Sequence, residues 1–167
     1  MKQIFILTAI IALLLHPVSF KREIPFSATA IEDRAILAGM EDDVSLFVFF
    51  SSVVEAESDR SVPPEGELTT EGRVMIAIVI LNRVSSDRFR NQNTIYDVLT
   101  ASGQFSTVVR RNGEYVSVTE RSDYSDYAVI EAIRRVEAGE APEVLFFNCI
   151  GYASEPYARI GGNYFSL

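Results

Sequence analysis

Two segments of this 167-residue chain are apolar around almost the whole circumference of a helix, and helices of that kind are stable only when buried. The first covers 44–57 (VSLFVFFSSVVEAE), with Asp42 or Asp43 as its cap. The second covers 71–84 (EGRVMIAIVILNRV) and begins after Thr69-Thr70. A chain of this length, 48% hydrophobic, encloses one sizeable core. We therefore expect both helices at the centre of a single domain.

The rest of the globular part is predicted to be helical with short strands. Pro63-Pro64 and Gly66 indicate a loop over 58–68. The other expected elements are a short helix over 94–100, a hairpin over 110–118 about Asn112-Gly113, a helix from Ser122 or Asp123 to about Ala138, a strand over 144–149 and a turn at Gly161-Gly162.

The N-terminus has the pattern of a targeting segment. Met1-Lys2 supplies a positive start, and an apolar run of about a dozen residues ends at His16-Pro17, which suits a signal sequence better than a membrane span of about 20 residues. We expect 1–20 to be a signal peptide or an uncleaved signal anchor, 21–42 a spacer and 43–167 the globular domain. A buried N-terminal helix is the less favoured alternative. The protein is thus expected in the periplasm, in the cell envelope or secreted.

Composition excludes several classes of chemistry. His16 is the only histidine, so the domain after it cannot assemble a Ser-His-Asp triad, a Cys-His pair or a histidine zinc site. The single Cys149 cannot form an internal disulfide, and we expect it to be a small buried residue. A net charge of -8 argues against nucleic-acid binding. We expect no cofactor and no metal, and carboxylates must carry any proton chemistry.

Glu55 is the candidate acid. It lies in the last turn of the first predicted helix and shares one face with Ser51 and Ser52. Burial and the negative end of the helix dipole both raise a carboxyl pKa, which suits a general acid. A glutamate at a helix end is more often simply solvated. Glu57, about 200° further round the helix, should face elsewhere and is not included.

Several motifs carry a resemblance to a known family. They are Glu55-Ala56, the segments 71–77 (EGRVMIA) and 79–84 (VILNRV), 93–96 (NTIY), 103–106 (GQFS) and 145–148 (LFFN), and Ile160-Gly161. Together they resemble the SleB-type cell wall hydrolases, the spore cortex-lytic enzyme family, over about residues 45–166. The resemblance implies an α+β, lysozyme-like fold with a helical core and a small β-hairpin or sheet.

The resemblance also implies a reaction and a catalytic residue. The reaction is cleavage of the peptidoglycan glycan strand between N-acetylmuramic acid and N-acetylglucosamine, of the lytic transglycosylase type. Glu55 matches the family's catalytic glutamate. It would protonate the glycosidic oxygen and then remove the proton of the muramyl C6 hydroxyl, which attacks C1 and closes an anhydro ring. Because water is not the nucleophile, no second carboxylate is required.

Five further residues are candidates for substrate binding. Gln104, Phe105 and Ser106 fall where the family shapes its sugar cleft, and amide and hydroxyl groups suit acetamido and hydroxyl groups. Asn148 ends the predicted strand, and Tyr152 is able to stack on a sugar ring. The alternatives are a turn with Phe105 in the core, a strand-end turn at Asn148 and a half-buried surface tyrosine.

The chain departs from the family pattern in three places. It has no tryptophan, the near-terminal Gly-x-His becomes Gly161-Gly162-Asn163, and the loop over 58–70 is long. Two alternatives therefore stay open: a non-catalytic peptidoglycan-binding or scaffold protein that retains the fold, and a water-using muramidase with Asp59 or Glu65 as its second carboxylate. The expected partner is peptidoglycan, with membrane contact only through the N-terminal segment. We expect a monomer.

Overall fold

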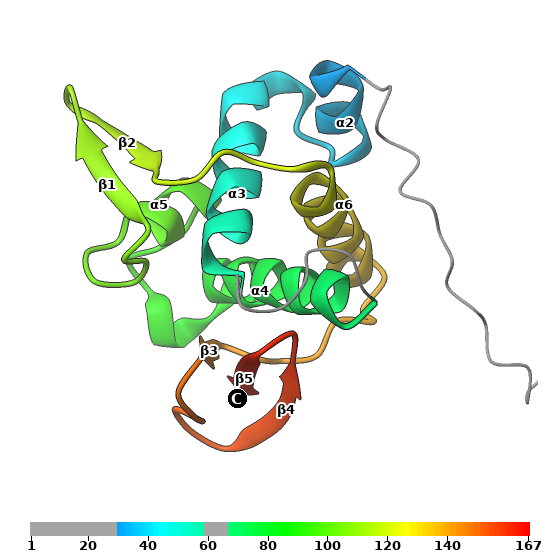
Figure 1. Ribbon diagram of the computed structural model, residues 1–167, viewed down its shortest axis with the longest axis vertical. Helices are drawn as coiled ribbons and strands as arrows, with labels where there is room; N and C mark the ends of the chain where they lie inside the picture. The colour runs from blue at the N-terminus through cyan, green and yellow to red at the C-terminus, as the bar shows by residue number, and fades with distance from the viewer. Residues whose placement is uncertain (1–29, 59–66) are drawn as a thin grey trace, which may run out of the picture.

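The computed structural model describes residues 30–58 and 67–167 (Figure 1). The predicted leader over 1–20 lies outside the described residues, as do residues 21–29 of the predicted spacer and the carboxylates Asp59 and Glu65. Within the described part, no helix is long and apolar enough to cross a membrane.

Three long helices form the core, as Figure 1 shows. They are α3 (Val44–Glu57), α4 (Glu67–Ser85) and α6 (Asp123–Glu137). Every residue from Val74 to Ile80 of α4 is buried, as are Phe47 and Phe50 of α3. The expected burial of the two apolar helices is thus confirmed.

The helix starts follow from capping residues. The Asp43 carboxylate accepts the Leu46 N–H at 2.8 Å, as expected for the first helix. Capping boxes open α5 (Ile95–Thr100) at Thr94 and α6 at Ser122. The second apolar helix begins at Glu67 rather than at residue 71, because nothing after Gly66 opposes helix formation.

The predicted hairpin is also present. Strands β1 (Val108–Arg111) and β2 (Glu114–Ser117) pair antiparallel, with Arg111 opposite Glu114. Asn112 and Gly113 have φ angles of 51° and 91°, so both residues adopt the left-handed conformation of a tight hairpin turn.

The last three strands form a second sheet that packs on α4. Its strands are β3 (Phe146–Asn148), β4 (Pro156–Ile160) and β5 (Asn163–Ser166), in the order β3-β5-β4 and antiparallel throughout. A Cβ atom on Gly72 would lie 3.0 Å from the Gly161 Cα atom, so this contact requires a glycine in α4. The fold is therefore α+β, with a helical core and a small antiparallel sheet, consistent with the lysozyme-like fold that the resemblance implies.

The packed part of the chain begins earlier than the expected boundary at residue 43. Helix α2 (Ile31–Leu37) places Ala35 and the following Ala38 in the core. Its Arg34 Nη1 donates to Asp123 Oδ1 at 2.5 Å and to Asp126 Oδ2 at 2.6 Å. A seven-residue helix has little periodicity, and these ion pairs join residues far apart in the sequence, so no local pattern indicates them. Short 3-10 turns at Glu41–Asp43 (η1) and Asp87–Phe89 (η2) complete the fold.

Candidate active site

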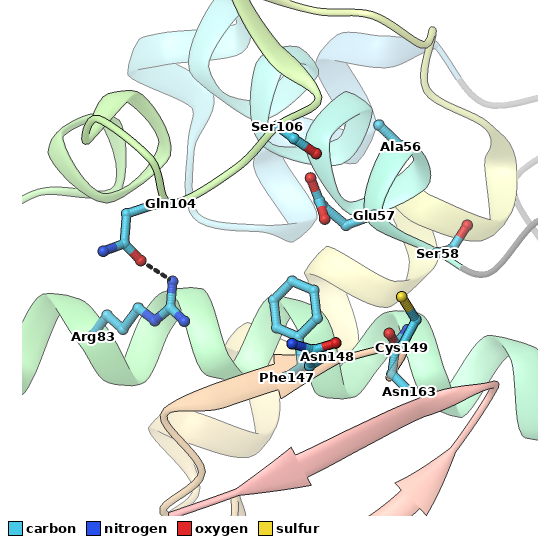
Figure 2. A pocket seen from close by; sticks show the side chains of 10 residues that line it. All are labelled: Ala56, Glu57, Ser58, Arg83, Gln104, Ser106, Phe147, Asn148, Cys149 and Asn163. Carbon is cyan, nitrogen blue, oxygen red and sulfur yellow. Dashed lines mark hydrogen bonds between the residues drawn. The ribbon is translucent and has the colours of Figure 1, made fainter. Parts of the chain in front are cut away.

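A pocket of about 470 Å³ opens beside the C-terminal end of α3 (Figure 2). The described residues that line it are Ala56, Glu57, Ser58, Arg83, Gln104, Ser106, Phe147, Asn148, Cys149 and Asn163. They come from the ends of α3 and α4, the loop before β1, the end of β3 and the start of β5. The pocket thus lies between the helical core and the second sheet, and its shape depends on the packing of both.

The charged groups of the pocket are Glu57 and Arg83. Thr107 Oγ1 donates a hydrogen bond to the Glu57 carboxylate. Arg83 Nη1 donates to Gln104 Oε1 at 2.7 Å, and Arg83 Nε donates to the Leu145 carbonyl oxygen at 2.8 Å. Burial lowers the pKa of Arg83 to about 10, and the charge of Glu57 opposes this decrease. The guanidinium therefore stays charged at neutral pH and fixes the Gln104 amide at the pocket wall.

Aromatic rings support the Arg83 side chain. The guanidinium carbon lies 5.1 Å from the ring centre of Phe89 and 5.7 Å from that of Phe105. Phe105, a candidate for substrate contact, is only 5% exposed and belongs to the core. This is the alternative that the sequence left open for it. Its role in the structure is to hold Arg83, and it does not line the pocket.

Three of the five predicted binding residues line this pocket: Gln104, Ser106 and Asn148. Asn148 Oδ1 accepts the Ile150 N–H at 2.8 Å, so part of its amide is used in a turn. Tyr152 is 42% exposed and packs edge-on against Tyr164, with ring centres 5.0 Å apart, and it is not among the described lining residues.

Seven of the ten described lining residues were not among the predicted site residues, and Asn163 and Cys149 are two of the seven. Asn163 is 3% exposed, and among the residues that the structure describes its Nδ2 atom has no hydrogen-bond partner. The one sequence feature that pointed to Asn163 was its position, where the resembled family has a histidine. Cys149 was expected to be buried, and this was wrong: it is exposed and follows the end of β3 directly. The strand stops at Asn148, so the next side chain is no longer covered by the sheet.

Glu55 lies in a separate network next to the pocket. Arg73 Nε donates to Glu55 Oε2 and Arg73 Nη2 donates to Oε1, each at 3.0 Å, and Ser122 Oγ donates to Oε2 at 2.6 Å. The Glu55 side chain is 18% exposed, so it is neither sealed in the core nor free in solvent. It is not among the described residues that line the pocket. The paired guanidinium stabilises the ionised carboxylate, which opposes the effect of burial and the helix dipole considered from the sequence.

The comparison with protein families agrees with a fold of this kind. The sequence model of the Cell Wall Hydrolase family matches residues 67–164, more than half of the chain, and the chain belongs to this family. Neither a curated protein nor a solved structure shows a significant match. Membership implies a hydrolase that acts on peptidoglycan in an envelope or extracellular location. The match begins after α3, so it does not include Glu55 or Glu57.

Proposed function

We propose that the protein cleaves the glycan strand of peptidoglycan between N-acetylmuramic acid and N-acetylglucosamine, by the lytic transglycosylase reaction and with Glu55 as the acid and base. The observation that carries the proposal is the polar pocket at the end of α3 in a member of the Cell Wall Hydrolase family. Its neutral amide and hydroxyl groups, on Gln104, Ser106, Asn148 and Asn163, suit the hydroxyl and acetamido groups of such a strand.

The network around Glu55 affects the two halves of this reaction differently. In the first half, Glu55 must hold a proton to give to the glycosidic oxygen, and the Arg73 guanidinium opposes protonation. In the second half, Glu55 acts as a carboxylate that takes the proton of the C6 hydroxyl. The same guanidinium stabilises that form. Arg73 and Ser122 also fix the direction of the carboxyl group, which a proton transfer requires.

Glu57 supports a second candidate, a water-using muramidase. Of the two glutamates, Glu57 is the one that lines the described pocket. A hydrolytic reaction needs two carboxylates, one as acid and one as base or nucleophile. Glu57 offers the second carboxylate within the described residues, whereas Asp59 and Glu65 lie outside them. The two reactions give different products, because an anhydro ring has one water fewer than a hydrolysed end.

A matched pair of variants tests the assignment. Purified sacculi are incubated with the wild type, Glu55→Gln and Glu57→Gln, and the soluble products are weighed by mass spectrometry. We expect anhydro products from the wild type, a loss of turnover by about three orders of magnitude or more in Glu55→Gln with the fold retained, and continued cleavage by Glu57→Gln. If only Glu57→Gln loses cleavage, the general acid is Glu57 and not Glu55. Sacculus binding without any product from the wild type would identify a binding or scaffold protein.

A further inference from the structure

We propose that Asn163 Nδ2 is the hydrogen-bond donor for the acetamido carbonyl oxygen of an N-acetylated sugar in the pocket. The inference rests on the proposed function, because it takes the glycan strand as the ligand. It goes further by naming the acetamido group as the part of that ligand that the pocket recognises.

The first observation is a buried donor without a partner. Asn163 is 3% exposed, and within the described part of the chain its Nδ2 atom makes no hydrogen bond. Buried polar groups in folded proteins are almost always paired, and an unpaired buried donor destabilises the fold. A ligand that supplies an acceptor at this atom therefore removes a penalty that the free protein carries.

The second observation is the position of this donor in the pocket wall. Asn163 is the first residue of β5, where it pairs with Ile160 across the glycine turn, and the next residue, Tyr164, pairs with Asn148 of β3. Pairing on both sides fixes the backbone from which the side chain projects. Figure 2 shows Asn163 on the sheet side of the pocket, across from Glu57 and Ser106. The donor is thus held in place before a ligand arrives.

The charges of the pocket favour a neutral acceptor over an anion. Glu57 places a carboxylate across the pocket from Asn163, and the whole chain carries a net charge of -8. Arg83, the lining cation, already directs Nη1 to Gln104 and Nε to the Leu145 carbonyl. An acetamido group supplies a carbonyl oxygen for Asn163 and an N–H for which the Glu57 carboxylate is an acceptor. A hydroxyl-only sugar lacks this pair of groups, so the pocket is expected to select acetylated sugars.

The experiment compares binding and stability in the same variants. The ligand is a tetramer of N-acetylglucosamine, which contains no N-acetylmuramic acid and so lacks the proposed scissile bond; the neutral, hydroxyl-only tetramer of glucose with the same β-1,4 linkage is the reference. Binding is measured by calorimetry for the wild type, Asn163→Leu and Asn163→Asp, and urea unfolding is measured without ligand. Asn91→Leu, the same change in an exposed turn, is the matched control.

We expect the wild type and Asn91→Leu to prefer the acetylated tetramer by about tenfold or more. We expect Asn163→Leu and Asn163→Asp to lose that preference. Asn163→Leu should unfold at the same or a higher urea concentration than the wild type, because it removes an unpaired buried donor. A residue with a purely structural role would show the reverse, with lower stability and an unchanged preference.

Three results would overturn the inference: no preference in the wild type, a preference retained in either folded Asn163 variant, or failure of both variants to fold. Its failure is distinguishable from failure of the proposed function. If the protein prefers acetylated sugars through Asn163 but releases no product from sacculi, the inference is supported and the proposed glycosidase activity is contradicted. If the protein cleaves sacculi and Asn163→Leu keeps the preference for acetylated sugars, the proposed function is supported and the inference is contradicted.

Discussion

Glu55 and Glu57 lie two positions apart in the last turn of α3, and their carboxylates meet different surroundings. Arg73 contacts both oxygens of Glu55 at 3.0 Å, whereas Glu57 accepts a hydrogen bond from Thr107 and lines the pocket. The helix geometry that predicts different directions for them is confirmed. The described pocket, however, lies on the side of Glu57.

Replacement of Arg73 by methionine should change the pH dependence of cleavage. Without the guanidinium, the neutral form of Glu55 is favoured, so the acid remains protonated to higher pH. The alkaline limb of kcat/KM against pH should then move upward. Arg73→Lys, which keeps the charge but not the two-point contact, should leave the limb close to its wild-type position. An identical limb in Arg73→Met would show that Glu55 is not the titrating acid.

Replacement of Gly72 by alanine should destabilise the protein. In an exposed helix this change stabilises by about 1 kcal/mol, because alanine is the better helix former. Here the added Cβ atom would meet the Gly161 Cα atom at 3.0 Å, and backbone atoms on both sides leave little room to adjust. We expect a loss of about 1–3 kcal/mol in the free energy of unfolding, measured with urea. An increase in stability would mean that the sheet does not pack this closely on α4.

Removal of α2 should weaken the domain. A chain of residues 43–167 lacks Arg34, Ala35 and Ala38, and Asp126, which is fully buried, then keeps only Arg121 of its two described arginine partners. Breaking a buried ion pair costs about 3–5 kcal/mol. The shorter chain should therefore unfold at a clearly lower urea concentration than a chain of residues 30–167. Arg34→Met in the longer chain should account for most of the difference. Equal unfolding midpoints would place the start of the domain at residue 43.

The ion pairs of Glu131 should make stability depend on acid pH. Hydrogen bonds from Arg134, and also from Arg135, hold the pKa of Glu131 below its ordinary value of 4.5. Since the folded pKa is lower than the unfolded one, this stabilisation is complete above about pH 4.5 and is lost as the pH falls through the folded pKa. Glu131→Gln should thus destabilise the protein by about 0.5 kcal/mol at pH 7, a small effect because water screens the pairs. The difference from the wild type should disappear toward pH 3. Glu143→Gln, at an exposed position, is the control and should show no such trend.

The sequence was sufficient to predict the features that depend on residues close together in the chain. Caps expected at Asp42 or Asp43 and at Ser122 or Asp123 predicted the starts of two helices, and the structure has them at Asp43 and Ser122. Asn112-Gly113 predicted the hairpin turn, because caps and tight turns depend on residues close together in the sequence. The apolar character of 44–57 and 71–84 predicted that both helices are buried, because exposing such surface to water is unfavourable.

Only the tertiary structure decided which groups meet in space. Three features depend on how α3, α4 and the second sheet pack together: the pairing of Arg73 with Glu55, the position of Glu57 in the pocket wall, and the Asn163 Nδ2 atom that has no partner among the described residues. Local preferences of the chain carry no record of these contacts, because their free energy comes from residues that are distant in sequence and adjacent only after folding. The sequence therefore predicts a helical core and a family. The arrangement of charges and hydrogen-bonding groups around the pocket results from tertiary packing.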